Sequence, residues 1–212
     1  MLLLTLEGID GSGKSTQAQL LVEALREEGY DPLLVREPGG TAFSERVRSL
    51  LLDPSFNVHP FAELLLFSAA RAQLVAERIR PALAEGRVVI CDRFYDSTTA
   101  YQGAGRDVAE SAWLDSFHKR VTDHLVPDRT FLVEVDVATA RRRRADEGDP
   151  DRMEEAGEAF YRRVVEAYAA LAEEHPDRIQ RLDGTRAIDD LHECIRAEVA
   201  ALLNAADAEE DV

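Results

Sequence analysis

Short apolar runs alternate with longer stretches of helical pattern along the whole chain. Runs this short are typical of strands that are buried on both faces of a parallel sheet. The five predicted strands are Leu2–Leu6, Pro32–Arg36, Arg87–Cys91, Thr130–Val135 and Arg178–Leu182. The predicted helices are Lys14–Glu28, Ala42–Leu51, Phe61–Ala84, Ala109–Val121, Ala138–Arg144, Glu155–Glu174 and Ile188–Asn204.

The alternation contains no low-complexity linker or internal repeat, so it predicts one α/β domain over residues 1–204. The expected architecture is a doubly wound, five-stranded parallel sheet flanked by helices. Residues 205–212 are expected to form a flexible acidic tail. Ligands of such sheets bind at the carboxyl ends of the strands, so candidate chemistry is expected in the residues that follow each strand.

A glycine-rich segment joins the first predicted strand to the first predicted helix. Gly8, Gly13, Lys14 and Ser15 have the G-x-x-x-x-G-K-[ST] spacing of a P-loop. Glycines let backbone N–H groups point at a phosphate, Lys14 can reach the β- and γ-phosphates, and the Ser15 hydroxyl can bind Mg²⁺. The strand–loop–helix context argues against an ordinary glycine turn and predicts a nucleoside triphosphate site. Its residues are Gly8, Ile9, Asp10, Gly11, Ser12, Gly13, Lys14, Ser15 and Thr16.

Composition narrows the class of partner. The chain has 41 acidic and 25 basic residues and a formal net charge of −16, which argues against a nucleic-acid or anionic-membrane surface. No apolar run approaches the roughly 20 residues of a membrane span, and the first leucines lack the basic segment of a signal peptide. Cys91 and Cys194 lie far apart without metal-ligand spacing, which is typical of reduced core residues in a cytoplasmic protein.

Charged residues follow the second and third predicted strands. The segment R-E-P-G-G-T (residues 36–41) contains a Pro-Gly-Gly turn signal, which an ordinary turn could also explain. Asp92 and Arg93 follow the third strand. A carboxylate there can hold the magnesium shell of a P-loop fold, and the arginine can donate two hydrogen bonds to phosphate oxygens. A surface ion pair between Asp92 and Arg93 is the alternative.

The long predicted helix places Glu63, Phe67, Arg71 and Leu74 on one face. An arginine one turn beyond a phenylalanine can hydrogen-bond the edge of a base that stacks on the ring. The alternative is that Phe67 is a core residue and Arg71 caps a surface.

Later in the chain, the arginine run Arg141–Arg144 and Arg152 flank an acidic segment that contains Gly148 and Pro150. A solvated helix face is the ordinary explanation of such a run. A mobile lid that brings arginines to a transferring phosphoryl group is the alternative.

Together these segments resemble the thymidylate kinase family, which phosphorylates dTMP to dTDP with ATP. The resemblance covers nearly the whole chain. It rests on residues 7–17 (E-G-I-D-G-S-G-K-S-T-Q), 36–41, 48–50 (R-S-L), 63–67 with 70–71, 92–93 with 97 and 100–103 (A-Y-Q-G), and 151–154 (D-R-M-E). It implies a P-loop NTPase fold with a small arginine-containing lid, ATP and Mg²⁺ as cofactors, dTMP as substrate and a homodimer.

The resemblance also implies an acceptor site. Asp10 would accept a hydrogen bond from the 3′-hydroxyl of dTMP, Phe67 would stack on thymine, and Arg71 would bond its edge. Tyr101 would crowd the sugar C2′, Ser97 and Gln102 would help to fix the base, and Arg48 would contact the phosphate. The complete implied set is Asp10, Arg48, Phe67, Arg71, Arg93, Ser97, Tyr101 and Gln102.

The catalytic residues that the resemblance implies are Lys14, Arg93, Arg143, Arg144 and Arg152, with Ser15 and Asp92 at the metal. The phosphate loop contains no arginine, which resembles the subgroup whose catalytic arginine comes from the lid, here about residues 143–153. Family lids often read R-G-x-L-D-R, whereas residues 145–152 read A-D-E-G-D-P-D-R. The register of Arg143 and Arg144 therefore stays open, while Arg152 aligns.

Two other functions remain as alternatives. A deoxynucleoside kinase would need a carboxylate base near a 5′-hydroxyl, and both Arg48 and the A-Y-Q-G segment favour a monophosphate acceptor instead. A GTPase switch would need an N-K-x-D motif, and the sequence has none.

The long helix also carries an apolar stripe roughly opposite Phe67 and Arg71, formed by Leu65, Ala69, Ala72 and Ala76. Small residues permit close helix packing, so a homodimer could form through this stripe. The alternative is that the stripe packs on the sheet.

Overall fold

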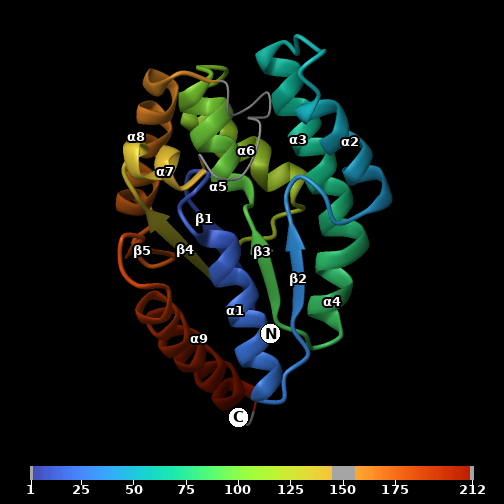
Figure 1. Cartoon of the computed structure of the whole chain (residues 1–212). Helices are drawn as coiled ribbons and strands as arrows, with labels where there is room; N and C mark the ends of the chain where they lie inside the picture. Colours follow the sequence, from blue (N-terminus) through green and yellow to red (C-terminus); the bar gives the residue numbers. More distant parts are fainter. Residues whose placement is uncertain (1, 145–155, 211–212) are drawn as a thin grey trace.

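One parallel sheet lies at the centre of the chain. The computed structural model describes residues 2–144 and 156–210 (Figure 1). Within them the strands are β1 (Leu3–Glu7), β2 (Leu33–Arg36), β3 (Val89–Asp92), β4 (Arg129–Glu134) and β5 (Ile179–Asp183). They are all parallel and pair in the order β2-β3-β1-β4-β5. The predicted five-stranded α/β sheet is confirmed.

Helices connect and cover the strands. They are α1 (Lys14–Glu27), α2 (Ala42–Leu52), α3 (Pro60–Leu74), α4 (Arg80–Ala84), α5 (Tyr95–Thr98), α6 (Ser111–Val121), α7 (Val137–Arg144), α8 (Glu158–Glu174) and α9 (Ile188–Glu210). Two further segments, η1 (Val75–Ile79) and η2 (Thr99–Gly105), are π-helical. No helix among the described residues is long and apolar enough to cross a membrane.

The core has one layer on each face of the sheet. Leu4 and Phe131 pack against α1 and α9, which lie side by side in Figure 1. Leu3 and Val89 pack in a second cluster with Ile79 of η1. Because successive strand residues point to opposite faces, the uninterrupted burial of β1 follows from its central position in the sheet. The strands run toward one end of the molecule, away from both chain termini (Figure 1).

The predicted helices differ from the structure around η1 and in residues 95–105. The expected helix Phe61–Ala84 contains the π-helical turn η1 between α3 and α4. Pro81, which lacks an N–H and whose ring clashes with the carbonyl four residues earlier, accounts for the wider turn. The sequence pattern predicts no helix in residues 95–105, where α5 and η2 lie.

The predicted C-terminal tail is also wrong in part. Helix α9 continues to Glu210, so residues 205–210 are helical, while residues 211–212 lie outside the described residues. Leu203 is buried against the core, and the alanines that follow it are the strongest helix formers. Packing and local propensity therefore extend the helix beyond Asn204.

The two isoleucines of α9 test how much this helix contributes to stability. Ile195 is fully buried, whereas Ile188 is 58% exposed. We expect Ile195→Ala to lower the free energy of unfolding by about 2–5 kcal/mol and Ile188→Ala by less than about 0.5 kcal/mol. Urea unfolding of both variants measures the difference. Equal effects would show that α9 does not pack on the sheet as described.

Candidate functional site

The loop between β1 and α1 has the backbone geometry of an anion site. Gly8 has a φ of 140° and Gly11 a φ of 81°, which favour glycine. A Cβ on Gly8 would lie 2.4 Å from the Val133 carbonyl oxygen, and one on Gly11 would lie 2.6 Å from that of Ala140. Gly13, the N-cap of α1, has no side chain that could cap the helix. The first N–H groups of α1 can therefore face a phosphate.

Lys14, the first residue of α1, is 5% exposed. Its ammonium is 3.5 Å from the Asp10 carboxylate and 3.5 Å from the carbonyl oxygen of Ile9. Burial and the charge of Arg93 lower the pKa of Lys14, against the attraction of Asp10. These contacts are long, so the ammonium can be redirected to a phosphate at little cost.

Ser15 and Asp92 meet at the end of β3. The Ser15 hydroxyl donates to Asp92 Oδ2 at 2.5 Å, and Asp92 Oδ1 is buried without a hydrogen-bond partner among the described residues. This pair fits Mg²⁺, which typically binds one or two protein oxygens and completes its shell with phosphates and water. Across the described ranges no group of three or more histidine, cysteine or acidic residues could hold a metal by itself. The metal prediction for Ser15 and Asp92 stays a prediction.

Arg93 is held rigidly next to Asp10. One guanidinium nitrogen donates to Asp10 Oδ1 at 2.6 Å and to the Tyr101 hydroxyl at 3.2 Å, and the other donates to Ser97 Oγ at 3.0 Å. The guanidinium also lies over the Tyr101 ring, 4.9 Å from its centre. Although burial alone would raise it, Arg93 and then Lys14 hold the pKa of Asp10 below its usual value. Asp10 is therefore ionised at neutral pH.

Buried Glu7, at the end of β1, fixes the segment that carries Arg93 and Ser97. Its Oε1 accepts hydrogen bonds from the backbone N–H groups of Phe94 and Ser97 at 2.7 and 3.3 Å. Its Oε2 accepts from the hydroxyls of Ser97 at 2.5 Å and Tyr168 at 2.8 Å. Burial and then the charge of Asp96 raise the pKa of Glu7. The structure thus adds Glu7 to the site as a buried anchor.

All the residues that the family resemblance implies for the acceptor site line one cavity. Its described walls are Asp10, Glu37, Pro38, Arg48, Leu52, Phe67, Arg71, Arg93, Ser97, Thr98, Tyr101 and Gln102. Phe67 is half-buried, and the amide of Gln102 donates to Glu63 at 3.0 Å. Arg48 donates to the Pro38 carbonyl oxygen at 3.1 Å. Residues from seven different elements and loops therefore converge at the carboxyl ends of β1, β2 and β3.

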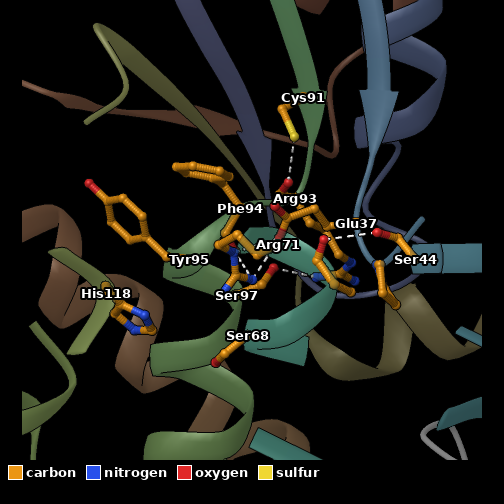
Figure 2. Close-up of polar contacts among 12 residues, drawn as sticks. Glu37, Ser44, Ser68, Arg71, Cys91, Arg93, Phe94, Tyr95, Ser97 and His118 are labelled. Atoms are coloured by element: carbon orange, nitrogen blue, oxygen red, sulfur yellow. Dashed lines mark hydrogen bonds and ion pairs between the residues drawn. The ribbon is translucent and has the colours of Figure 1, made fainter. Parts of the chain in front are cut away.

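Arg71 is almost fully buried between Glu37 and Phe94 (Figure 2). Its Nε and Nη2 lie 2.7 and 2.6 Å from Glu37 Oε2, and Nη2 donates to the Phe94 carbonyl oxygen at 3.2 Å. Its Nη1 has no hydrogen-bond partner among the described residues. Burial raises the pKa of Glu37 to about 7 despite the attraction of Arg71. Sequence reasoning missed Glu37; its place directly after a strand was the available signal.

A second cavity lies on the other side of the phosphate loop. The residues that line it are Gly11, Ser12, Gly13, Thr16, Gln17, Arg143, Gly184, Arg186, Ile188 and Leu191. Arg143 donates to the carbonyl oxygens of Gly11, Ser12 and Gly184, at 3.4, 3.2 and 2.9 Å. Sequence reasoning missed Gly184 and Arg186, which follow β5 without a recognisable motif.

The predicted lid is described only at its first residues. Arg143 borders the second cavity, and the Arg144 guanidinium lies over the Tyr161 ring, 5.4 Å from its centre. The charge of Arg144 is close enough to help lower the pKa of Asp10. Arg152 and the rest of the expected lid lie outside the described residues.

Comparison with known proteins decides the family. The family model described as "Thymidylate kinase" matches residues 6–195, which is most of the chain. The chain belongs to the thymidylate kinase family. Members of this family phosphorylate dTMP to dTDP for dTTP synthesis.

Individual thymidylate kinases agree with this assignment. That of Chlorobium chlorochromatii is 48% identical over 216 aligned residues, covering 95% of this chain and 96% of the relative. That of Deinococcus radiodurans is 45% identical and covers 94% and 96%. The crystal structure of thymidylate kinase from Ehrlichia chaffeensis has 36% identity and a TM-score of 0.75, covering 96% of this chain and 98% of that chain.

Lys14 can be tested against the only other lysine of the sequence, the exposed Lys119. We expect Lys14→Ala to lower kcat for phosphoryl transfer at least about 10²-fold, because the phosphate loop then lacks a cation for the developing charge. Lys119→Ala should keep kcat within about twofold of the parent. Steady-state kinetics, with thermal unfolding to check the fold, measure both. A folded Lys14→Ala protein with unchanged kcat would contradict the role of Lys14.

Proposed function

We propose that the chain transfers the terminal phosphoryl group of ATP to the 5′-phosphate of dTMP, with Mg²⁺ bound. One observation carries this proposal: all the residues implied to bind dTMP line a single cavity beside the phosphate loop. The base would stack on Phe67, and Arg71 Nη1 would donate to the thymine C4 carbonyl. The unpartnered state of Nη1 among the described residues supports this contact.

The phosphate loop and the cavity beyond it are the proposed site of ATP. Gly8–Thr16 would surround the donor phosphates, and Arg143 and Arg186 would border the rest of the nucleotide. Mg²⁺, when bound by Ser15 and Asp92, would neutralise charge on the donor phosphates.

The proposed mechanism is positioning with charge neutralisation. A phosphate monoester is already a nucleophile at neutral pH, so no general base is needed, and Asp10 is free to accept from the sugar hydroxyl. Arg93 would bind phosphate oxygens between donor and acceptor, where charge is greatest in the transition state. Lys14 would act from the donor side. Arg144 and Arg152 are the proposed sources of a further positive charge from the lid.

The preference for thymine over cytosine tests whether dTMP is the phosphoryl acceptor. Cytosine has an amino group at C4, where thymine has a carbonyl. In dCMP two donors, this amino group and Arg71 Nη1, would therefore face each other with no acceptor between them. We expect kcat/KM to be at least about 10²-fold lower for dCMP than for dTMP. ADP release measured with dTMP, dCMP and thymidine decides the question. Equal turnover of dCMP would contradict the thymine site, and good turnover of thymidine would favour a nucleoside kinase.

We also propose a homodimer through the apolar stripe on α3 and η1. Leu65, Ala69, Ala72 and Ala76 are all exposed in the single chain, so the stripe does not pack on the sheet. The exposed ring of Trp113 on neighbouring α6 extends this apolar surface.

Light scattering tests the dimer. We expect a mass of twice 23.6 kDa at micromolar concentration. Leu65→Glu, which puts a charge into the stripe, should shift the protein to the monomer. Val126→Glu, at an apolar residue of similar exposure outside α3, should leave the dimer intact. A monomeric parent protein would contradict the proposal.

A further inference from the structure

Glu37 occupies a fixed position at the edge of the acceptor cavity. Its backbone N–H donates to the carbonyl oxygen of Asp92 at 3.0 Å, which ties the end of β2 to the end of β3. The turn that follows is held by Glu45, whose Oε1 accepts from the N–H of Gly40 at 2.8 Å. The Glu37 side chain is 5% exposed and lines the cavity. The backbone that carries the Glu37 carboxylate is therefore held in place by hydrogen bonds.

The contacts with Glu37 determine the orientation of the Arg71 guanidinium. Nε and Nη2 are on one edge of the guanidinium plane, and both lie within 2.7 Å of Glu37 Oε2. The Phe94 carbonyl oxygen accepts a third bond from Nη2, and the guanidinium lies 5.7 Å from the centre of the Phe94 ring. Among the described residues only Nη1 is then left without an acceptor, and Arg71 lines the cavity.

We propose that Glu37 is the positioning residue that sets the preference for thymine over cytosine. It fixes the edge of Arg71 that carries Nε and Nη2, so that Nη1 meets C4 of the base. This inference rests on the proposed binding of the base edge by Arg71. A guanidinium that could rotate would turn its donors away from the cytosine amino group, and the mismatch that excludes dCMP would be lost. If the Glu37–Arg71 ion pair had only a structural role, its loss would instead lower kcat/KM for dTMP and for dCMP by the same factor.

Glu37→Gln tests the proposal with little change of shape. An amide keeps one oxygen but loses the charge that binds both Nε and Nη2 of Arg71. We expect the ratio of kcat/KM for dTMP to that for dCMP to fall at least about tenfold. KM for dTMP should rise by a larger factor than kcat falls, and KM for ATP should stay within about twofold.

Glu134→Gln is the matched control. Glu134 is also a carboxylate paired with Nε and Nη2 of one arginine, since it accepts from both nitrogens of Arg181 at 2.9 Å, but it does not line the cavity. We expect this variant to keep the dTMP-to-dCMP ratio of the parent. If Glu37→Gln does not fold, Glu37→Asp keeps the charge but shortens the side chain, and it should lower the ratio in the same direction.

The outcomes separate this inference from the proposed function. A folded Glu37→Gln protein whose ratio stays within about threefold of the parent would overturn the positioning role. A fall in kcat/KM by the same factor for dTMP and dCMP would also overturn it. A parent enzyme that turns over dCMP as well as dTMP would instead overturn the proposed acceptor.

Discussion

The functional site depends on the contacts of the buried carboxylates at the carboxyl ends of β1, β2 and β3. Each of them contacts an arginine or several hydrogen-bond donors. An unpaired buried charge is strongly destabilising, whereas a pair with good hydrogen bonds is tolerated. Glu37 pairs with Arg71, and Asp10 pairs with Arg93. Glu7 accepts three hydrogen bonds from the segment that presents Arg93 and a fourth from the Tyr168 hydroxyl of α8. These contacts hold the side chains rigid before a ligand binds, which is the condition for electrostatic stabilisation without reorganisation.

The same pairing indicates where ligands can add contacts. Among the buried polar atoms that lack hydrogen-bond partners in the described part of the chain are Arg71 Nη1 and Asp92 Oδ1. The first is a donor in the acceptor cavity, and the second is an oxygen beside the P-loop hydroxyl of Ser15. A base carbonyl suits the first and a cation suits the second. Arg93 directly follows Asp92 in the sequence and also lines the acceptor cavity, where its guanidinium contacts Asp10.

Sequence reasoning worked where a residue type and a fixed spacing determine the chemistry. The P-loop could be predicted because its glycines and Lys14 act through local backbone geometry. The acceptor residues needed the family resemblance, because Arg71 and Tyr101 meet only through tertiary packing. Helix α5 and η2 were missed because their Ser, Thr and Gly residues have low helix propensity, and contacts with Glu7 and Arg163 hold them. Glu37 looked like part of a turn because its partner is 34 residues away.

A crystal structure with dTMP bound tests the central claim most directly. The account predicts thymine over the Phe67 ring, with its O4 within about 3.2 Å of Arg71 Nη1. It also predicts the phosphate beside Arg93 and an unchanged Glu37–Arg71 pair. A base bound in the cavity lined by Gly184 and Arg186, or an Arg71 that leaves Glu37 to reach the nucleotide, would contradict it.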